Sequence, residues 1–159
     1  MSTAENQRGG ARVRFPPPLV FLAFILAGLG WSLVRPIGFG ANRIALIVIG
    51  TLVAVVAVML AAWAIGLFRR TGQDPAPWMP TPELIVQGPY RFTRNPMYVA
   101  MTLLQVGIGV ALDNPWIVLL ALPALFVVHV IAVRPEEAYL EEKFGDSYRR
   151  YRTAVRRYI

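Results

Sequence analysis

Four long apolar runs are the feature of this sequence that most restricts its fold. They cover residues 19–34, 44–68, 97–112 and 116–133. The second run is long enough, as a helix, to cross the hydrocarbon core of a bilayer, which is about 30 Å thick. Hydrophobic residues make up 56% of the 159-residue chain and come in runs instead of alternating with polar residues. A soluble domain of this size could not bury them all, so the sequence predicts an all-α integral membrane protein with about four transmembrane helices.

The segments between the apolar runs predict how the helices are connected. Residues 113–115, Asp-Asn-Pro, can do little more than turn the chain, so the third and fourth helices should form a closing antiparallel hairpin. Residues 71–87 are polar and rich in proline, and so long a loop in a small protein suggests a function. The polar residues 1–18 are predicted to be a mobile leader, and the whole chain, residues 1–159, a single domain.

The distribution of basic residues predicts the orientation in the membrane. With a cytoplasmic N-terminus, fourteen of the 16 Lys and Arg residues lie on the cytoplasmic side, and only Arg35 and Arg43 lie outside. Cytoplasmic segments of membrane proteins are enriched in these residues. We therefore expect both termini and the loop at 71–87 to face the cytoplasm. The same enrichment explains the net charge of +7 without a nucleic-acid partner.

The counts of cysteine and histidine exclude several kinds of site. The chain has no cysteine, which excludes disulfides, thiolate metal ligands and a cysteine nucleophile. Its single histidine, His129, cannot supply the several imidazoles that a histidine-based metal site uses, so we predict no bound metal. We interpret His129, which lies in the fourth apolar run, as a polar group satisfied within the protein.

A polar and doubly basic segment, residues 88–98, leads into the third apolar run. Asn95 can accept a hydrogen bond from a free backbone N–H, and Pro96 fits the first turn of a helix. A helix that begins there points its positive end at the membrane surface beside Arg91 and Arg94. This arrangement is suited to binding an anion, although two arginines that anchor a capped membrane helix would give the same pattern.

Two adjacent glutamates, Glu136 and Glu137, follow the fourth apolar run on the same side as this segment. A carboxylate at the membrane boundary needs a partner. That partner is either an internal arginine, Arg94 or Arg134, or a bound ligand that carries hydroxyls or an ammonium group. Pro135 is expected to kink the helix or to begin a new one.

The C-terminal residues predict a short amphipathic helix that lies on the membrane surface. Gly145 suits a helix C-cap, and Asp146 suits the N-cap of the next helix. In that helix Tyr148, Tyr151 and Val155 share one face, while arginines cover the rest. Such a helix is attracted to anionic lipid, and anchoring is the simplest role for its arginines.

Taken in order, these features resemble the isoprenylcysteine carboxyl methyltransferase family and, mainly in the paired glutamates, a wider group of membrane phospholipid N-methyltransferases. The resemblance covers residues 75–157, about half of the chain. It rests on the combined order and spacing of Gly88, Pro89, Tyr90, Arg91, Arg94, Asn95, Pro96 and Tyr98, then Asn114 and Pro115, then Glu136, Glu137, Phe144, Gly145, Tyr148 and Tyr151.

The resemblance implies methyl transfer from S-adenosyl-L-methionine to a lipophilic acceptor at the cytoplasmic face of the membrane. By position in the family motif, the residues implied to bind the cofactor are Pro82, Glu83, Leu84, Ile85, Tyr90, Asn95, Pro96, Met97, Tyr98, Glu136 and Glu137. Arg134 is the nearest stand-in for the family arginine that faces the acceptor. From its position beside the helix start, we predict that Arg94 helps to hold an anionic group there, and we take Arg134 and Arg94 as the candidate catalytic residues. Methyl transfer needs mainly positioning, so neither a catalytic triad nor a metal is expected.

Two positions differ from the family pattern and leave the acceptor open. The isoprenylcysteine enzymes usually carry His where this chain has Asn95, and Ala132 stands in the place of the arginine that faces the substrate carboxylate, with Arg134 nearest. The predicted acceptor is the carboxylate of a prenylcysteine-like or other small lipophilic acid. The alternatives are the headgroup amine of a phospholipid, or a non-catalytic membrane protein in which arginines and glutamates form a structural lattice. Cofactor binding separates the last alternative from the other two.

Overall fold

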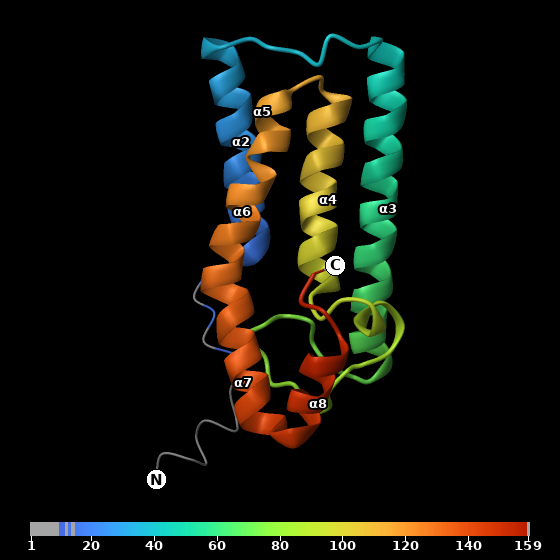
Figure 1. Cartoon of the computed structure of the whole chain (residues 1–159), viewed down its shortest axis with the longest axis vertical. Coiled ribbons are helices and arrows are strands. Elements are labelled where there is room, and N and C mark those ends of the chain that lie inside the picture. The colour runs from blue at the N-terminus through green and yellow to red at the C-terminus, as the bar shows by residue number, and fades with distance from the viewer. Residues whose placement is uncertain (1–9, 12, 14, 159) are drawn as a thin grey trace.

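The computed structural model describes residues 10–11, 13 and 15–158, which form an elongated bundle of helices (Figure 1). In chain order its elements are α2 (Pro17–Val34), α3 (Arg43–Arg70), η1 (Gly88–Arg91), α4 (Pro96–Ala111), α5 (Pro115–Leu119), α6 (Ala121–Val128), η2 (His129–Val133), α7 (Arg134–Phe144) and α8 (Asp146–Ala154). No β-strand occurs among the described residues, in agreement with the predicted all-α class.

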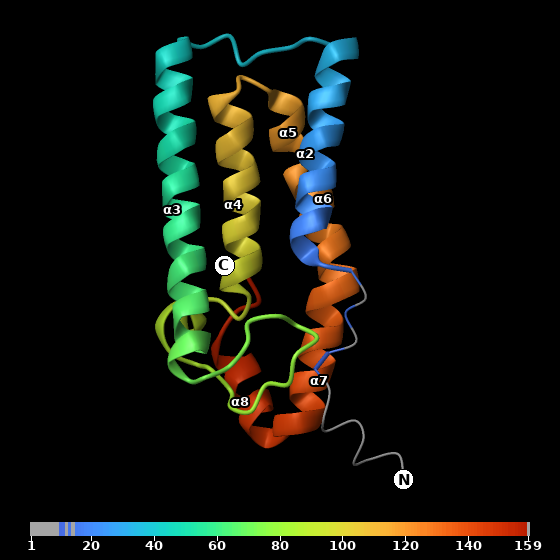
Figure 2. The same cartoon turned by 180° about the vertical axis from the view of Figure 1, so that it is seen from behind.

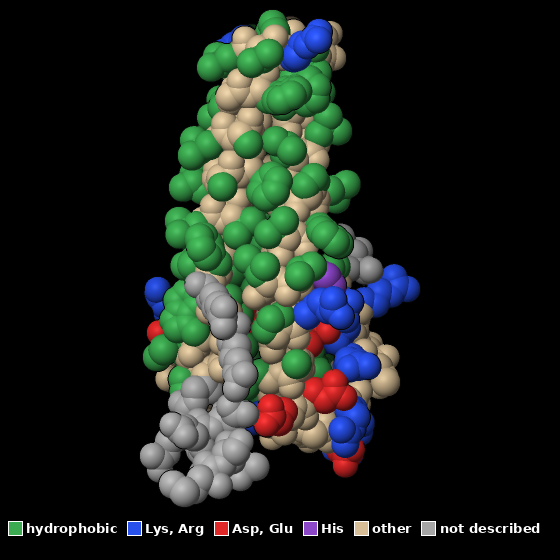
Figure 3. Space-filling view, turned by 90° about the vertical axis from the view of Figure 1, so that its left-hand side faces the viewer, with side chains coloured by type: hydrophobic (Ala, Val, Ile, Leu, Met, Phe, Trp, Pro, Cys, Tyr) green, Lys and Arg blue, Asp and Glu red, His purple; other side chains and the backbone are tan. Residues whose placement is uncertain are grey.

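Among the described residues, three helical stretches are long and apolar enough to cross a membrane: Pro17–Val34, Arg43–Arg70 and Pro115–Phe144. The chain is therefore an integral membrane protein. The third predicted span, α4, is apolar but has only 16 residues. Large apolar side chains on α2 and α3 face outward, among them Leu33 at 86% and Ile44 at 72% exposure. Figure 3 shows a broad band of such side chains, with most charged side chains gathered below it.

The short helix α4 lies inside the bundle (Figures 1 and 2). It packs between α3 on one side and α5 with α6 on the other, while α2 packs against α5 and α6. Small residues bring α3 and α4 together: a Cβ atom added at Gly107 would lie 2.7 Å from the Ala54 nitrogen and 2.8 Å from the Gly50 oxygen. Two helix backbones can approach this closely only where no larger side chain intervenes.

The turn between α4 and α5 forms the hairpin that the sequence predicts. Asp113 adopts a positive φ of 52°, which reverses the chain. The Asn114 side chain caps α5 by accepting a hydrogen bond from the Ile117 N–H at 3.2 Å. The Asp113 carboxylate accepts from the Phe39 N–H at 2.7 Å, so the hairpin is fixed to the segment that joins α2 and α3.

The second arm of the hairpin, from Pro115 to Phe144, is a single helical stretch with an irregular turn at η2. Pro135 lacks a backbone N–H, and its ring crowds the carbonyl of the preceding turn. The Arg134 N–H donates to the His129 carbonyl, five residues back, which makes η2 a π-helical turn. Pro135 lies in the first turn of α7, as predicted, but the junction is a widened turn and not a break.

The two ends of the bundle differ in charge. Arg35 and Arg43 lie where α2 and α3 are joined, while the proline-rich loop, η1, α7 and α8 lie at the opposite end (Figure 2). Arg8, Arg12 and Arg14, which the orientation prediction also used, lie outside the described residues. Within the predicted mobile leader, Ala11 and Val13 pack against the protein and are only 4% and 8% exposed, whereas Phe15 is 59% exposed.

Candidate functional site

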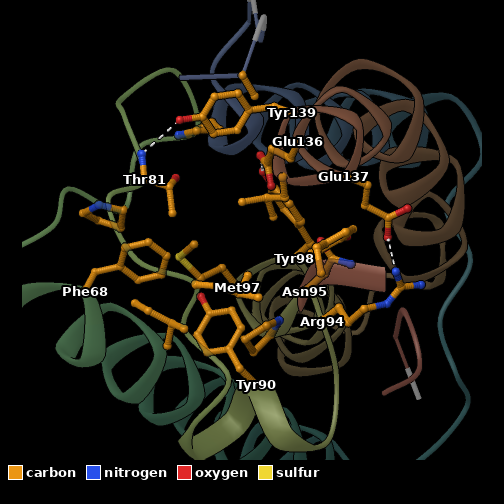
Figure 4. A pocket seen from close by; sticks show the side chains of 18 of the residues that line it. Phe68, Thr81, Tyr90, Arg94, Asn95, Met97, Tyr98, Glu136, Glu137 and Tyr139 are labelled. Atoms are coloured by element: carbon orange, nitrogen blue, oxygen red, sulfur yellow. Dashed lines mark hydrogen bonds and ion pairs between the residues drawn. The ribbon is translucent and has the colours of Figure 1, made fainter. Parts of the chain in front are cut away.

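A pocket lies at the end of the bundle where α3 stops and α4 begins (Figure 4). Its walls come from the loop at 71–87, from η1, from the first turn of α4, and from α7 and α8. Apolar and aromatic side chains make up much of the lining, including Phe68, Leu84, Ile85, Met97, Tyr139 and Leu140. Segments far apart in the sequence thus meet in one concave and largely apolar site, which is typical of a small-molecule binding site.

Tyr90 is held in a fixed position on one wall of the pocket. Its ring packs edge-on against Phe68 with the ring centres 6.0 Å apart, and its backbone carbonyl accepts from the Tyr151 hydroxyl at 2.7 Å. The side chain is 6% exposed, yet its hydroxyl has no hydrogen-bond partner in the described part of the chain. Burial, and to a lesser extent the Glu136 carboxylate, raises the pKa of Tyr90, so the hydroxyl stays protonated. A ligand would give this buried donor a partner.

Glu136 presents a carboxylate to the same pocket from the first turn of α7. The hydroxyl of the buried Tyr98 donates to its Oε1 atom. Figure 4 shows Glu136 facing the cavity near Tyr98 and Tyr139. No further hydrogen bond to this carboxylate is made by the described residues. It can therefore accept additional hydrogen bonds from an ammonium group or from hydroxyls.

Glu137, in contrast, is occupied by two arginines. Arg157 forms a bidentate pair with it, from Nε to Oε1 at 2.9 Å and from Nη2 to Oε2 at 2.8 Å. The Arg94 Nη1 atom lies 3.2 Å from the Glu137 Oε1 atom, and these two side chains are 9% and 12% exposed. The sequence analysis considered an internal arginine or a bound ligand as the partner of the glutamates, and the two carboxylates differ in this respect. Glu137 has an internal arginine, whereas Glu136 faces the cavity.

The segment that precedes α4 also holds the C-terminal end of the chain. The Arg94 N–H donates to the Arg156 carbonyl at 2.9 Å. Thr93 Oγ1 and Asn95 Nδ2 both donate to the Arg157 carbonyl, at 2.9 and 3.0 Å. Helix α4 begins directly after Asn95, as predicted, but the side chain makes no capping bond to a described residue. The predicted cap is wrong because the Asn95 amide is turned toward the C-terminal segment.

Helix α8 turns its tyrosine face toward the pocket. Tyr148 is 1% exposed and Tyr151 bonds to η1, so the apolar face of this helix packs on protein. Its contact with a membrane surface stays a prediction. Gly145, with a φ of 51°, ends α7 as expected. Asp146 does not cap α8, because its carboxylate accepts from the Arg149 side chain instead.

His129 begins the π-helical turn and is satisfied within the protein, as predicted. Its Nδ1 atom lies 2.9 Å from the Tyr158 hydroxyl oxygen. This contact joins the C-terminal segment to the second arm of the hairpin. Across residues 10–11, 13 and 15–158, no group of three His, Cys, Asp or Glu side chains is placed to hold a metal ion.

Comparison with known proteins relates this arrangement to a family. A profile of the family described as phospholipid methyltransferase matches residues 42–147, which include every element from α3 to α7. The chain belongs to the phospholipid methyltransferase family. An uncharacterized protein from Haemophilus influenzae is 36% identical to it over 63 residues, which are 40% of this chain and 100% of that protein. Membership confirms the resemblance to this group of membrane methyltransferases, and it indicates methyltransferase activity.

The pocket brings together most of the site residues that the sequence predicts. Those that line it are Leu84, Ile85, Tyr90, Arg94, Asn95, Pro96, Met97, Tyr98, Glu136 and Glu137. Pro82, Glu83 and Arg134 are exposed and lie outside the lining. The proposed roles of both sets, in cofactor binding and in catalysis, remain predictions.

The lining also contains residues that the sequence analysis did not predict to bind the cofactor or to act in catalysis. They come from the end of α3, the proline-rich loop, α7 and α8, and include Phe68, Asp74, Thr81, Tyr139, Tyr148 and Tyr151. A signal was available for Tyr139, which follows Glu136 by three residues and so shares its helix face. Phe68 and Asp74 carry no such signal, because only the path of the chain brings them to the segment at 88–98.

Proposed function

We propose that the protein transfers a methyl group from S-adenosyl-L-methionine to a lipophilic acceptor at the cytoplasmic face of the membrane. Family membership supports the reaction class. The observation that carries the cofactor assignment is the presence, in one pocket, of a buried Tyr90 hydroxyl with no hydrogen-bond partner among the described residues and a Glu136 carboxylate that can accept further hydrogen bonds. Both groups line a cavity that lies at the charged end of an apolar bundle.

The residues of the pocket fit the chemical groups of this cofactor. Glu136 offers a charged acceptor for an ammonium group or for ribose hydroxyls. Tyr90 offers a buried donor for a carboxylate or a ring nitrogen. The rings of Phe68 and Tyr139, together with the Met97 side chain, provide apolar surface for a purine ring.

The protein's own contribution to methyl transfer is to bind and orient the cofactor and the acceptor and to exclude water from them. When bound, the cofactor supplies a methyl group that is already activated by its sulfonium centre. A nucleophile placed in line with that methyl needs no metal or covalent intermediate, and good orientation alone is worth up to about 7–11 kcal/mol. The buried Tyr98, fixed by its bond to Glu136, and the rigid wall at Tyr90 supply such a framework. A lipophilic acceptor reaches the site from the apolar bundle, and the polar cofactor from the charged end.

Two acceptors fit this chemistry, a lipophilic carboxylate and an uncharged amine, and one observation favours the amine. A lipophilic carboxylate is ionised at neutral pH and needs no base, but it requires a cation to orient it. Arg157 and Arg134 lie outside the lining, and Arg94, which lines it, has its charge paired with Glu137, although its Nε and Nη1 atoms make no hydrogen bond to a described residue. This distribution favours an uncharged amine, such as a deprotonated phospholipid headgroup amine, as the second candidate acceptor.

The proposal is tested with the purified protein in lipid nanodiscs and S-adenosyl-L-methionine labelled in its methyl group. We expect saturable binding and label in the lipid fraction after incubation with a lipid extract. Alkaline hydrolysis releases labelled methanol from a methyl ester but leaves an N-methyl amine intact, which separates the two acceptors. Absence of both binding and lipid labelling would overturn the proposed function in favour of a structural role.

Removal of the Tyr90 hydroxyl is expected to weaken cofactor binding without harming the fold. In Tyr90→Phe the lost group bonds to no described residue, so the thermal stability of the cofactor-free protein should be unchanged or slightly higher. Affinity for S-adenosyl-L-methionine should fall by about three- to ten-fold, the value of one hydrogen bond. The matched control is Tyr151→Phe, which removes a hydrogen bond to the Tyr90 carbonyl. This variant should lower the thermal stability of the cofactor-free protein, which Tyr90→Phe should not. Unchanged affinity in Tyr90→Phe would contradict the assignment of this hydroxyl.

A further inference from the structure

The proline-rich loop that walls the pocket has few hydrogen-bond donors of its own. Prolines occupy positions 75, 77, 80 and 82 and contribute no backbone N–H. Within the loop, the Met79 N–H donates to the Ala76 carbonyl at 2.9 Å. The carbonyl groups of such a segment must find donors elsewhere, so other parts of the chain decide where the loop rests.

Two of those donors come from the N-terminal end of the described chain. The Gly10 N–H donates to the Trp78 carbonyl at 3.1 Å, and the Ala11 N–H donates to the Pro77 carbonyl at 2.8 Å. Glycine is required for this approach, because a Cβ atom at Gly10 would overlap the backbone of Trp78 and Met79.

The same segment is anchored in the core on its other side. Ala11 and Val13 are 4% and 8% exposed, and both belong to the buried cluster that contains Phe21 and Val133. Ala11 also lines the pocket beside Pro77. The segment therefore connects the helical core to the outer wall of the pocket. The loop has a second attachment on the α7 side, where the Thr81 N–H donates to the Tyr139 hydroxyl at 3.2 Å.

We infer that Gly10, Ala11 and Val13 form an N-terminal strap that holds the proline-rich loop closed over the pocket and so sets how long the cofactor stays bound. The inference rests on the proposed function for the identity of the cofactor. The inference that the strap holds the loop does not depend on the proposed function, because the contacts between strap and loop are made within the chain itself. Release of the strap frees the loop at Pro77 and Trp78 while the attachment at Tyr139 remains.

The test compares Gly10→Ala with Gly66→Ala. A methyl group at Gly10 overlaps loop backbone, whereas a Cβ atom at Gly66, on α3, has no neighbouring atom within 4 Å. Hydrogen exchange of the loop amides is measured by mass spectrometry in the absence of cofactor, and the dissociation of labelled S-adenosyl-L-methionine is then followed by dilution. We expect faster exchange over 76–81 and about ten-fold faster dissociation in Gly10→Ala only, consistent with the loss of two hydrogen bonds.

A second variant makes the result independent of any folding defect in the first. Ala11→Pro removes the N–H that bonds to Pro77 and should also increase loop exchange and cofactor dissociation. Wild-type exchange in both strap variants overturns the inference, and so does wild-type dissociation in a variant whose exchange has increased. Failure of the wild-type protein to bind the cofactor at all would instead count against the proposed function, and the exchange data would still decide whether the strap holds the loop.

Discussion

Replacing Glu137 by Gln is expected to lower the free energy of unfolding of the cofactor-free protein by about 3–5 kcal/mol, because it leaves buried arginine charge without its partner. Arg94 is 9% exposed and has its charge contact with Glu137, so most of the cost arises there. Arg157 is 40% exposed, so water compensates part of its loss. Its bidentate bond to Glu137 also fastens the C-terminal segment, which should loosen in the variant.

The measurement is thermal unfolding in detergent without cofactor, with Glu141→Gln as the control. Glu141 also pairs with an arginine, Arg152, at 2.7 Å, but the two side chains are 33% and 50% exposed. An exposed pair contributes at most about 1 kcal/mol. We expect the melting temperature of Glu137→Gln to fall by about 10 °C or more and that of Glu141→Gln to change little. Equal melting temperatures for the two variants would mean that the buried pair does not stabilise the fold.

The helices could be predicted from the sequence because a segment that crosses lipid must satisfy its backbone internally and be apolar along its length. The run at 44–68 became α3 with two residues added at its C-terminal end and one at its N-terminal end. The hairpin followed from the three residues at 113–115, which leave the chain no other path. The predicted fourth run ended at residue 133, yet the helix continues to Phe144. The π-helical turn before Pro135 allows the helix to continue past this proline, and the residue pattern does not predict such a turn.

The contacts of the C-terminal segment could not be predicted, for a different reason. Thr93, Arg94 and Asn95 bond to the carbonyl groups of Arg156 and Arg157. Every residue has a backbone carbonyl, so the types of the side chains do not show which carbonyl groups accept these hydrogen bonds. The sequence predicted either an anion site or an anchored, capped helix for this segment, whereas part of its hydrogen-bonding capacity secures the end of the chain.

The fold likewise determines which glutamate pairs with the arginines and which faces the cavity. Neighbours on a helix point about 100° apart, so Glu136 and Glu137 cannot both face the pocket equally. Which of them does so depends on the rotation of α7, and the wide turn at η2 sets that rotation. The sequence therefore predicted an internal arginine as one possible partner of the pair, which Glu137 has, but it did not indicate which of the two carboxylates faces the cavity.

Glu136→Gln is expected to reduce affinity for S-adenosyl-L-methionine by about ten- to a hundred-fold while the cofactor-free protein keeps near-normal stability. The variant loses one charge-assisted hydrogen bond to the ligand, which is worth about 1.5–3 kcal/mol. It keeps the fold because the Gln oxygen can still accept the hydrogen bond from Tyr98 that Glu136 accepts now. Shape and volume at the pocket wall are also nearly unchanged.

The control is Glu142→Gln, which removes the same charge from an exposed position of α7 outside the lining. Equilibrium binding of labelled cofactor and thermal unfolding with and without cofactor are measured for both variants. Glu142→Gln should retain the full ligand-induced rise in melting temperature, and Glu136→Gln should lose most of it. The comparison with Glu137→Gln then separates the two carboxylates, since one variant loses the ligand response and the other loses intrinsic stability. Wild-type affinity in Glu136→Gln would show that this carboxylate does not contact the cofactor, and the ligand site would then have to lie elsewhere in the pocket.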